Sequence, residues 1–232
     1  MERITKAVCA NKPPLIVEIG PGQGALTSLL LARAGRVVAV EIDPAMIALL
    51  AARFAGEAKL TVVHGDVLQT DLSQWGSAVL AGNIPYYITS PILDRIFAAR
   101  SAIREAVLLV QREVAQRLVS EPGSRDYGLL SVRAQVYAEA KYLFKVPPGA
   151  FSPPPKVESA VVRLVMRDAV EDQDKFLEFA ARCFGHKRKT LRNNLIGYYN
   201  KELVEAQPEA GLRGEQLSIP LMRGLMARLE KG

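Results

Sequence analysis

Three glycines spaced two residues apart stand directly after a short apolar run. Leu15–Ile19 leads into Gly20-Pro21-Gly22-Gln23-Gly24, and a Leu- and Ala-rich stretch follows. Glycine permits a tight turn and the close approach of a ligand to the backbone, next to the positive end of the following helix. Gly20, Gly22 and Ala25 also satisfy the relaxed dinucleotide fingerprint, and Glu41, at the end of the next apolar run, suits a ribose. The loop predicts a site for a nucleotide-like ligand but leaves the ligand's identity open.

Polar side chains also accompany the other apolar runs. Glu18 stands just before the first glycine, Asp66 follows Leu60–Val63, and Asn83 follows Ala78–Ala81. Open α/β sheets bind ligands outside the carboxyl ends of their strands. We therefore expect these residues and the glycine loop to converge on one cleft.

Asn83-Ile84-Pro85-Tyr86 is the most informative tetrapeptide, and it resembles the Asn/Asp-X-Pro-Tyr/Phe signature of enzymes that methylate exocyclic amino nitrogens. Such an amine is a poor nucleophile because its lone pair is delocalised into the ring. The Asn83 amide oxygen and the Ile84 carbonyl could accept both amine hydrogens, with Pro85 fixing the backbone between them. Tyr86 would stack on a flipped base, and Phe151 could close the other face. The chemistry is methyl transfer governed by positioning, and it requires no metal.

The first 110 residues alternate β-rich runs with amphipathic stretches, which implies crossover connections and a parallel sheet covered on both faces. This predicts a doubly wound, mostly parallel α/β fold. The expected strands are Leu15–Ile19, Arg36–Glu41, Leu60–Val63, Ala78–Ala81 and Ala106–Val110, and the expected helices are Ala25–Ala34, Pro44–Phe54 and Thr89–Ala99.

The pattern changes beyond Gln111. Arg112–Val119 and Leu129–Tyr137 read as helices, the Pro-rich Val146–Lys156 as an extended surface segment, and Ser159–Met166 as a last strand. From Asp172 onward the pattern is helical. We expect a catalytic domain over residues 1–167 and a small helical domain over residues 168–232.

Basic residues gather in this tail without intervening acids, namely Lys187, Arg188, Lys189 and Arg192. A helix would place most of them on one side, where they could contact RNA phosphates, with Asn193 and Asn194 adding hydrogen bonds. A solvated helix face is the ordinary alternative for such a run.

Bulk composition excludes several classes of protein. The 232 residues carry a formal net charge of +6, and charged residues interrupt the most hydrophobic stretch. The first residues lack the apolar core of a secretory signal, and the two cysteines show no metal-like spacing. We expect a cytoplasmic monomer with no membrane association.

Glu18-Ile-Gly-Pro-Gly-Gln-Gly together with Glu41, Asp66 and Asn83 resembles the S-adenosylmethionine pocket of class I methyltransferases. The resemblance implies that Gly20 and Gly22 approach the methionine part, that Glu41 accepts the ribose hydroxyls, and that Asp66 meets the adenine amine. It also implies that Ile42 and Val67 belong to this site.

Longer segments resemble the rRNA adenine dimethyltransferase family over nearly all of the chain. They are Asn83-Ile-Pro-Tyr-Tyr-Ile, Val110-Gln-Arg-Glu-Val-Ala, Tyr127-Gly-Leu-Leu-Ser-Val, Phe151-Ser-Pro-Pro-Pro-Lys-Val-Glu-Ser and Phe184-Gly-His-Lys-Arg-Lys-Thr-Leu-Arg-Asn. The small-subunit branch is the most similar. This resemblance implies dimethylation of two adjacent adenosines in a hairpin near the 3′ end of small-subunit rRNA, with the immature small ribosomal subunit as partner.

One departure and three alternatives accompany this interpretation. Residues 1–14 lack the basic Gln-Asn/His-Phe-Leu segment that helps to cover the cofactor in the resembling family, so we expect weaker cofactor binding. A nicotinamide-dependent oxidoreductase would explain the glycine loop but not Asn83–Tyr86. A non-catalytic RNA-binding assembly factor and a large-subunit rRNA methyltransferase are the other two alternatives.

Overall fold

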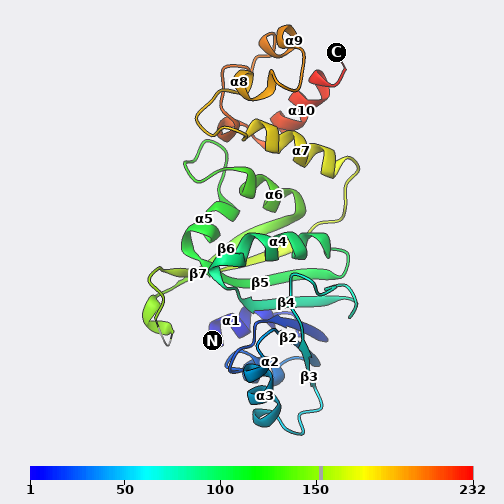
Figure 1. The fold of residues 1–232 in the computed structure, drawn as a ribbon, viewed down its shortest axis with the longest axis vertical. Helices are drawn as coiled ribbons and strands as arrows, with labels where there is room; N and C mark the ends of the chain where they lie inside the picture. Colours follow the sequence, from blue (N-terminus) through cyan, green and yellow to red (C-terminus); the bar gives the residue numbers. More distant parts are fainter. Residues whose placement is uncertain (152–153, 232) are drawn as a thin grey trace. The chain divides into compact units, whose positions relative to one another are not determined.

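A seven-stranded sheet, with strands between residues 15 and 166, organises the computed structural model, which describes residues 1–151 and 154–231 (Figure 1). The spatial order of its strands is β3-β2-β1-β4-β5-β7-β6. The strands are β1 Leu15–Ile19, β2 Arg36–Glu41, β3 Leu60–His64, β4 Ala78–Asn83, β5 Ile103–Gln111, β6 Ala138–Val146 and β7 Ser159–Met166. The first five strands are parallel to one another, whereas β7 pairs antiparallel with both β5 and β6.

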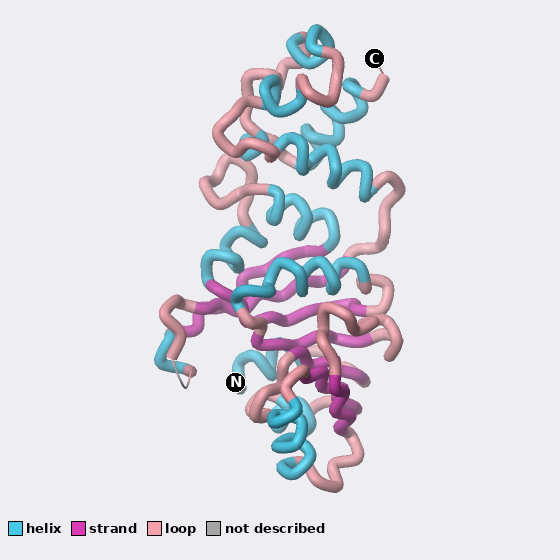
Figure 2. Tube along the Cα trace, in the orientation of Figure 1, coloured by secondary structure: helices cyan, strands magenta, loops and turns pink. Residues whose placement is uncertain are grey.

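Helices flank the parallel strands, and those that follow β1, β2 and β4 form crossover connections. They are α1 Glu2–Val8, α2 Thr27–Leu31, α3 Pro44–Arg53, the short 3₁₀ helix η1 Tyr86–Ile88, and α4 Thr89–Ala98. The Asp43 carboxylate caps α3 by accepting the Ala45 N–H at 2.8 Å, and Pro44 occupies the first turn, where no amide donor is needed. The predicted doubly wound, mostly parallel architecture is confirmed (Figure 2).

The sheet is buried on both faces. On one face, Ile4 and Val8 of α1 and Leu30 of α2 join a core with Val107 and Leu109 of β5. Because side chains alternate along a strand, the neighbouring β5 residues point to the opposite face, and Ala106, Leu108 and Val110 are fully buried there. Helix α4 also contacts β5 and contributes Ile92, Leu93, Ile96 and Phe97, all buried and none of them in the first core, so it covers this second face.

The chain folds into two compact units. The sheet unit comprises residues 1–115 and 137–168, and the helical unit comprises residues 116–136 and 169–232. The helical unit contains the second half of α5 Arg112–Val119, with α6 Leu129–Tyr137, α7 Gln173–Cys183, α8 Leu191–Leu195, α9 Lys201–Glu205, the 3₁₀ turn η3 Gly214–Gln216 and α10 Ile219–Leu229. The sheet unit ends at Asp168, and residues 116–136 belong with the helical tail rather than with the sheet.

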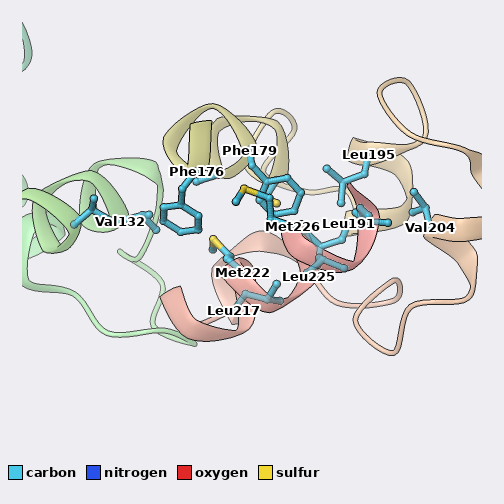
Figure 3. Packing of buried hydrophobic residues seen from close by; sticks show 14 of the residues in the cluster. Val132, Phe176, Phe179, Leu191, Leu195, Val204, Leu217, Met222, Leu225 and Met226 are labelled. Carbon is cyan, nitrogen blue, oxygen red and sulfur yellow. The ribbon is translucent and has the colours of Figure 1, made fainter. Parts of the chain in front are cut away.

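A second hydrophobic core explains why this early segment belongs with the tail. Val132 of α6 packs in one cluster with Phe176 and Phe179 of α7 and with Met222 and Leu225 of α10 (Figure 3). The five side chains are at most 1% exposed. The short helices of the tail cannot bury an apolar face alone, and α6 supplies part of the missing surface.

Three local expectations were wrong. No element was expected over Ala138–Lys145, which forms all but the last residue of the edge strand β6, nor over Glu2–Val8, which forms α1. The Pro-rich segment is not extended throughout, because Val146 ends β6 and Pro148–Ala150 forms the 3₁₀ turn η2; residues 152–153 lie outside the described part. No helix in the described ranges is long and apolar enough to cross a membrane.

Candidate active site

The glycine loop after β1 has a backbone that only glycine adopts without strain. Gly20, Gly22 and Gly24 have φ values of +62°, +54° and +81°. A Cβ at Gly24 would also lie 2.6 Å from the Phe54 ring, because the loop packs tightly against α3. The Gly20 N–H donates to the Val40 carbonyl at 3.0 Å, so the loop is tied to β2 at its first residue. Its remaining residues are held at the carboxyl end of the sheet.

Glu41 is 7% exposed and organises the next strand end. Its Oε1 accepts the N–H groups of Ile42 at 2.9 Å and Asp43 at 3.0 Å, and its Oε2 accepts the Gly22 N–H at 3.1 Å. A carboxylate offers about four acceptor positions, so one remains on Oε2 beside the glycine loop. The carboxylate therefore couples the two loops and can still receive a hydroxyl donor.

Glu18 lies beneath the loop and is 1% exposed. Burial raises the pKa of its carboxyl to about 7, and the charge of Glu41 adds a smaller rise. The Glu18 Oε2 and Thr27 Oγ1 atoms are buried without a hydrogen-bond partner among the described residues. Such atoms are uncommon in folded proteins, and a polar ligand or water beside the loop can satisfy them.

The remaining residues expected at this site lie at neighbouring strand ends. Asp66 is half-buried after β3, and its Oδ1 accepts the Leu68 N–H at 2.8 Å, which fixes a turn. Val67 is buried at 8% exposure, whereas the Ile42 side chain is 61% exposed. An exposed isoleucine beside a buried carboxylate presents apolar surface at the sheet edge. Because β3, β2, β1 and β4 are consecutive parallel neighbours, the structure brings all these loops to one edge.

Asn83 to Tyr86 form a pocket at the end of β4. The Asn83 side chain is exposed, whereas Ile84 is buried and its N–H donates to the Leu109 carbonyl at 3.0 Å. Asn83, Ile84, Pro85, Tyr86, Phe151 and Pro155 line a cavity of about 260 Å³. This volume is slightly below the ~300–1,000 Å³ typical of ligand pockets, so the pocket suits a small group such as one planar ring. The structure thus brings Phe151 together with the tetrapeptide, 65 residues apart in sequence.

Ser159 is a residue that the sequence analysis missed. Its hydroxyl lies 2.6 Å from the Tyr86 hydroxyl, which holds the Tyr86 ring in place from the first residue of β7. Since the two residues are 73 positions apart, no local signal in the sequence could indicate the bond.

These observations fit S-adenosylmethionine as the ligand. The loop approaches a ligand with glycine backbone, and Glu41 keeps an acceptor position for a hydroxyl. A Cβ at Gly82 would lie 3.0 Å from the Ile19 carbonyl oxygen, because the backbones of β1 and β4 lie in close contact there. These two backbones form the floor of the site. The pocket of Asn83–Tyr86 begins at the next residue, so a methyl donor and an acceptor base would be neighbours.

The basic cluster of the helical unit differs from its expected form. Lys187, Arg188 and Lys189 are exposed in a turn before α8, not on a helix, because the Asn194 amide ties this turn down. Asn194 Nδ2 donates to the Cys183 carbonyl at 2.9 Å, and its Oδ1 accepts the His186 N–H at 3.1 Å. Asn194 is buried, so its expected contribution to phosphate binding was wrong.

Arg192 is also committed to other contacts. Its Nε donates to Glu205 Oε1 at 2.8 Å, and its Nη1 donates to Asn193 Oδ1 at 3.3 Å. This ion pair offsets one of the four cluster charges. Lys187 Nζ donates to the Arg125 carbonyl at 3.3 Å, a contact that leaves its charge uncompensated.

Comparisons with known proteins agree with the motifs. The family described as ribosomal RNA adenine dimethylase matches residues 1–228. A protein of Acidobacterium capsulatum named ribosomal RNA small subunit methyltransferase A is 44% identical over 229 residues, covering 93% of this chain and 81% of that protein. A protein of the same name from Xanthomonas campestris is 43% identical, covering 94% of this chain and 87% of its own length. The nicotinamide alternative has no support among these relatives.

Solved structures extend the agreement to the fold. A dimethyladenosine transferase from Plasmodium falciparum superposes with a TM-score of 0.83 at 25% identity, covering 99% of this chain and 94% of that one. The 23S rRNA methyltransferase ErmE gives a TM-score of 0.73 at 28% identity, with coverages of 99% and 97%. Because the family match spans nearly the whole chain and the relatives are 43–44% identical, this chain belongs to the ribosomal RNA adenine dimethylase family.

Proposed function

We propose that this S-adenosylmethionine-dependent rRNA adenine methyltransferase modifies the N6 amines of two adjacent adenosines in the 3′-terminal hairpin of small-subunit rRNA. The observation that carries the proposal is the pocket of Asn83–Tyr86 and Phe151, one residue beyond the β1–β4 floor of the cofactor loops. The names of the relatives at 43–44% identity support the small subunit as the target.

The first strand ends would hold the cofactor, which supplies an activated methyl group on a sulfonium when it is bound. Gly20 and Gly22 allow the backbone to approach its methionine part. The free acceptor position of Glu41 receives a ribose hydroxyl, and Asp66 receives the adenine amine. Ile42 and Val67 contribute apolar surface to the adenine, and Glu18 supports the glycine loop from below.

The tetrapeptide would orient the target amine. Asn83 Oδ1 and the Ile84 carbonyl oxygen accept hydrogen bonds from the two N6–H groups. These bonds orient the nitrogen lone pair toward the methyl donor. Pro85, with a φ of −58°, fixes the backbone between the two acceptors. Tyr86, held through Ser159, stacks on one face of the base, and Phe151 covers the other. Their combined effect is positioning, the main requirement of an in-line transfer between two bound groups.

The helical unit would hold the RNA around the target hairpin. Lys187, Arg188 and Lys189 are exposed cations in one turn, and phosphate contacts are the principal source of nucleic-acid affinity. We include Arg192 in this surface with a smaller contribution, because Glu205 offsets its charge. The proposal further comprises a cytoplasmic monomer acting on the immature small subunit.

A large-subunit target is the second candidate, favoured by the 99% overlap with ErmE. The test is methyl transfer by the purified chain to immature small subunits and to large-subunit precursor RNA, with the modified nucleotides identified by mass spectrometry. Dimethyladenosine at two adjacent positions of the small-subunit RNA is the expected product. Modification of the large-subunit RNA alone would favour the second candidate. No transfer to either RNA, despite cofactor binding, would favour a non-catalytic assembly factor.

A further inference from the structure

We propose that a second pocket beside the target-base pocket binds the nucleobase adjacent to the adenosine being methylated. This inference rests on the proposed function, because it concerns how the same RNA substrate is held. Both pockets belong to the sheet unit.

The second pocket is a cavity of about 270 Å³, close to the target pocket's volume of about 260 Å³. Its walls are mostly apolar and come from three parts of the sheet unit. Ile4 comes from α1, Leu109 from the end of β5, and Phe144, Val146 and Ala150 from β6 and the turn after it. The cavity can therefore take a planar ring of the same size as the one expected in the target pocket.

Phe151 joins the two pockets, because it is a wall of both. Apolar side chains such as Phe are known to insert between neighbouring bases and unstack them. Two bases separated by one inserted ring are about twice the ~3.4 Å base spacing apart, which adjacent nucleotides can span. The arrangement suits two neighbouring nucleotides, one on each side of Phe151.

The lining of the second pocket carries two cations, Arg3 and Lys145, against one acid, Glu2, which suits the phosphates of the same strand. The Arg3 guanidinium lies 3.8 Å from the centre of the Phe144 ring, and Lys145 also lines the pocket. Lys145 pairs with Glu158, which also pairs with Arg112 at 2.6 Å. Two cations sharing one carboxylate leave a net positive charge at these strand ends, and one of the two, Lys145, is a wall of the second pocket.

Ala150 provides a clean test because it lines the second pocket but is exposed, so a larger side chain there does not disturb the core. Ala150→Phe should fill the pocket. Gly149→Phe is the matched control, because it adds a phenylalanine side chain one residue away. Gly149 lines neither pocket, and a Cβ there meets nothing within 4 Å. Both variants would be compared with the wild type on three RNA hairpins that contain the target adenosine. The first hairpin is intact, and the others have an abasic nucleotide on the 5′ or the 3′ side of the target.

For the wild type, one of the two abasic hairpins should raise KM by roughly tenfold, within the range that stacking of a single base contributes. Ala150→Phe should raise KM on the intact hairpin by a similar factor and show little further increase on that abasic hairpin, because both changes remove the same contact. Gly149→Phe should behave as the wild type. Additive effects of the protein and RNA changes, or no effect of Ala150→Phe, would overturn the inference. Failure of the wild type to methylate any hairpin or small-subunit RNA would instead count against the proposed function itself.

Discussion

Asn83 is the residue whose proposed role depends most directly on the acceptor base. Its side chain is exposed at the end of β4 and lines the target pocket, and it is separate from the Glu41 and Gly22 contacts of the cofactor loops. Asn83→Ala should therefore lower kcat by about 100-fold or more, on the scale of losing one positioned hydrogen-bonding group. Single-turnover methylation of the hairpin would measure the loss. Calorimetry of S-adenosylhomocysteine should show affinity within a few-fold of the wild type, and unchanged turnover would remove Asn83 from the mechanism.

Glu41 is expected to act on the cofactor rather than on the base. Glu41→Gln removes the charge and one acceptor oxygen, while the remaining oxygen can keep the bonds to Ile42 and Asp43. Affinity for S-adenosylmethionine should fall by about 1.5–3 kcal/mol, the value of a hydrogen bond to a charged group. Asp43→Asn is the control, because Asp43 is the exposed cap of α3 and asparagine retains an acceptor oxygen there. This variant should bind S-adenosylmethionine as the wild type does. Equal affinities of the two variants would contradict the assignment of Glu41.

Glu18 gives the free energy of unfolding a predictable dependence on pH. The pKa of its carboxyl is about 7 in the folded protein, above the ordinary value of about 4.5, because the group is buried. The folded state holds this proton more tightly than the unfolded state, so stability falls as pH rises from about 4.5 to 7. A shift of this size corresponds to about 3 kcal/mol. Glu18→Gln should remove that loss, so the variant should gain stability over the wild type between pH 5 and pH 8.

The difference in the free energy of unfolding is measured by urea unfolding of the wild type and Glu18→Gln at pH 5 and pH 8, without cofactor. Glu57→Gln makes the same chemical change at an exposed position and is the control. Parallel profiles for the wild type and Glu18→Gln would show that the buried carboxyl does not titrate in this range.

At the scale of the elements, two glycines of the loop separate the cost of a strained backbone from the cost of a steric clash. Gly22 and Gly24 both have positive φ, but a Cβ at Gly22 meets nothing within 4 Å, whereas one at Gly24 lies 2.6 Å from Phe54. Gly22→Ala should cost about 1–2 kcal/mol of stability from the backbone alone. Gly24→Ala should cost a further ~1–3 kcal/mol because α3 must move. Thermal unfolding of the two variants measures the difference, and equal losses would mean that the loop packs less tightly against Phe54.

The sequence predicted the elements that have their own periodicity. β1 and β2 were predicted with their observed bounds, because their Val- and Ile-rich runs are continuous and end at glycine or acidic residues. β6 was missed because its first residues, Ala138-Glu139-Ala140-Lys141, have no strand pattern and are placed by pairing with β7. A strand that is defined by its partner cannot be found from its own residues.

The site was predictable to a similar degree. The strand-end residues could be grouped because parallel topology brings carboxyl ends together, whatever the length of the connections. The Tyr86–Ser159 bond and the pairing of Arg192 with Glu205 depend on long-range packing, which charge runs and short motifs do not encode. The positive charge of the tail was correctly located in sequence, but its helical presentation was wrong.

At the scale of the whole molecule, the proposed function places chemistry and RNA affinity in different units. The glycine loop and both pockets belong to the sheet unit, whereas the cluster of Lys187, Arg188 and Lys189 belongs to the helical unit. Changes in one unit should therefore leave the binding functions of the other intact. Neutralising the cluster tests this separation, because RNA affinity and cofactor affinity can be measured independently on the full chain.

Replacing Lys187, Arg188 and Lys189 by glutamine should weaken binding of a small-subunit rRNA hairpin at low salt. If each contacts a phosphate, the slope of log affinity against log salt should become shallower by about 0.7–0.9 for each lost charge. Arg192→Gln should change the slope by less, because Glu205 already offsets that cation. Replacing the exposed Lys59, Lys201 and Lys231 gives the same change in net charge and should leave the slope nearly unaltered. Equal slopes for the two triple variants would identify the cluster as an ordinary solvated surface, since only direct phosphate contacts release counterions in proportion to the residues removed.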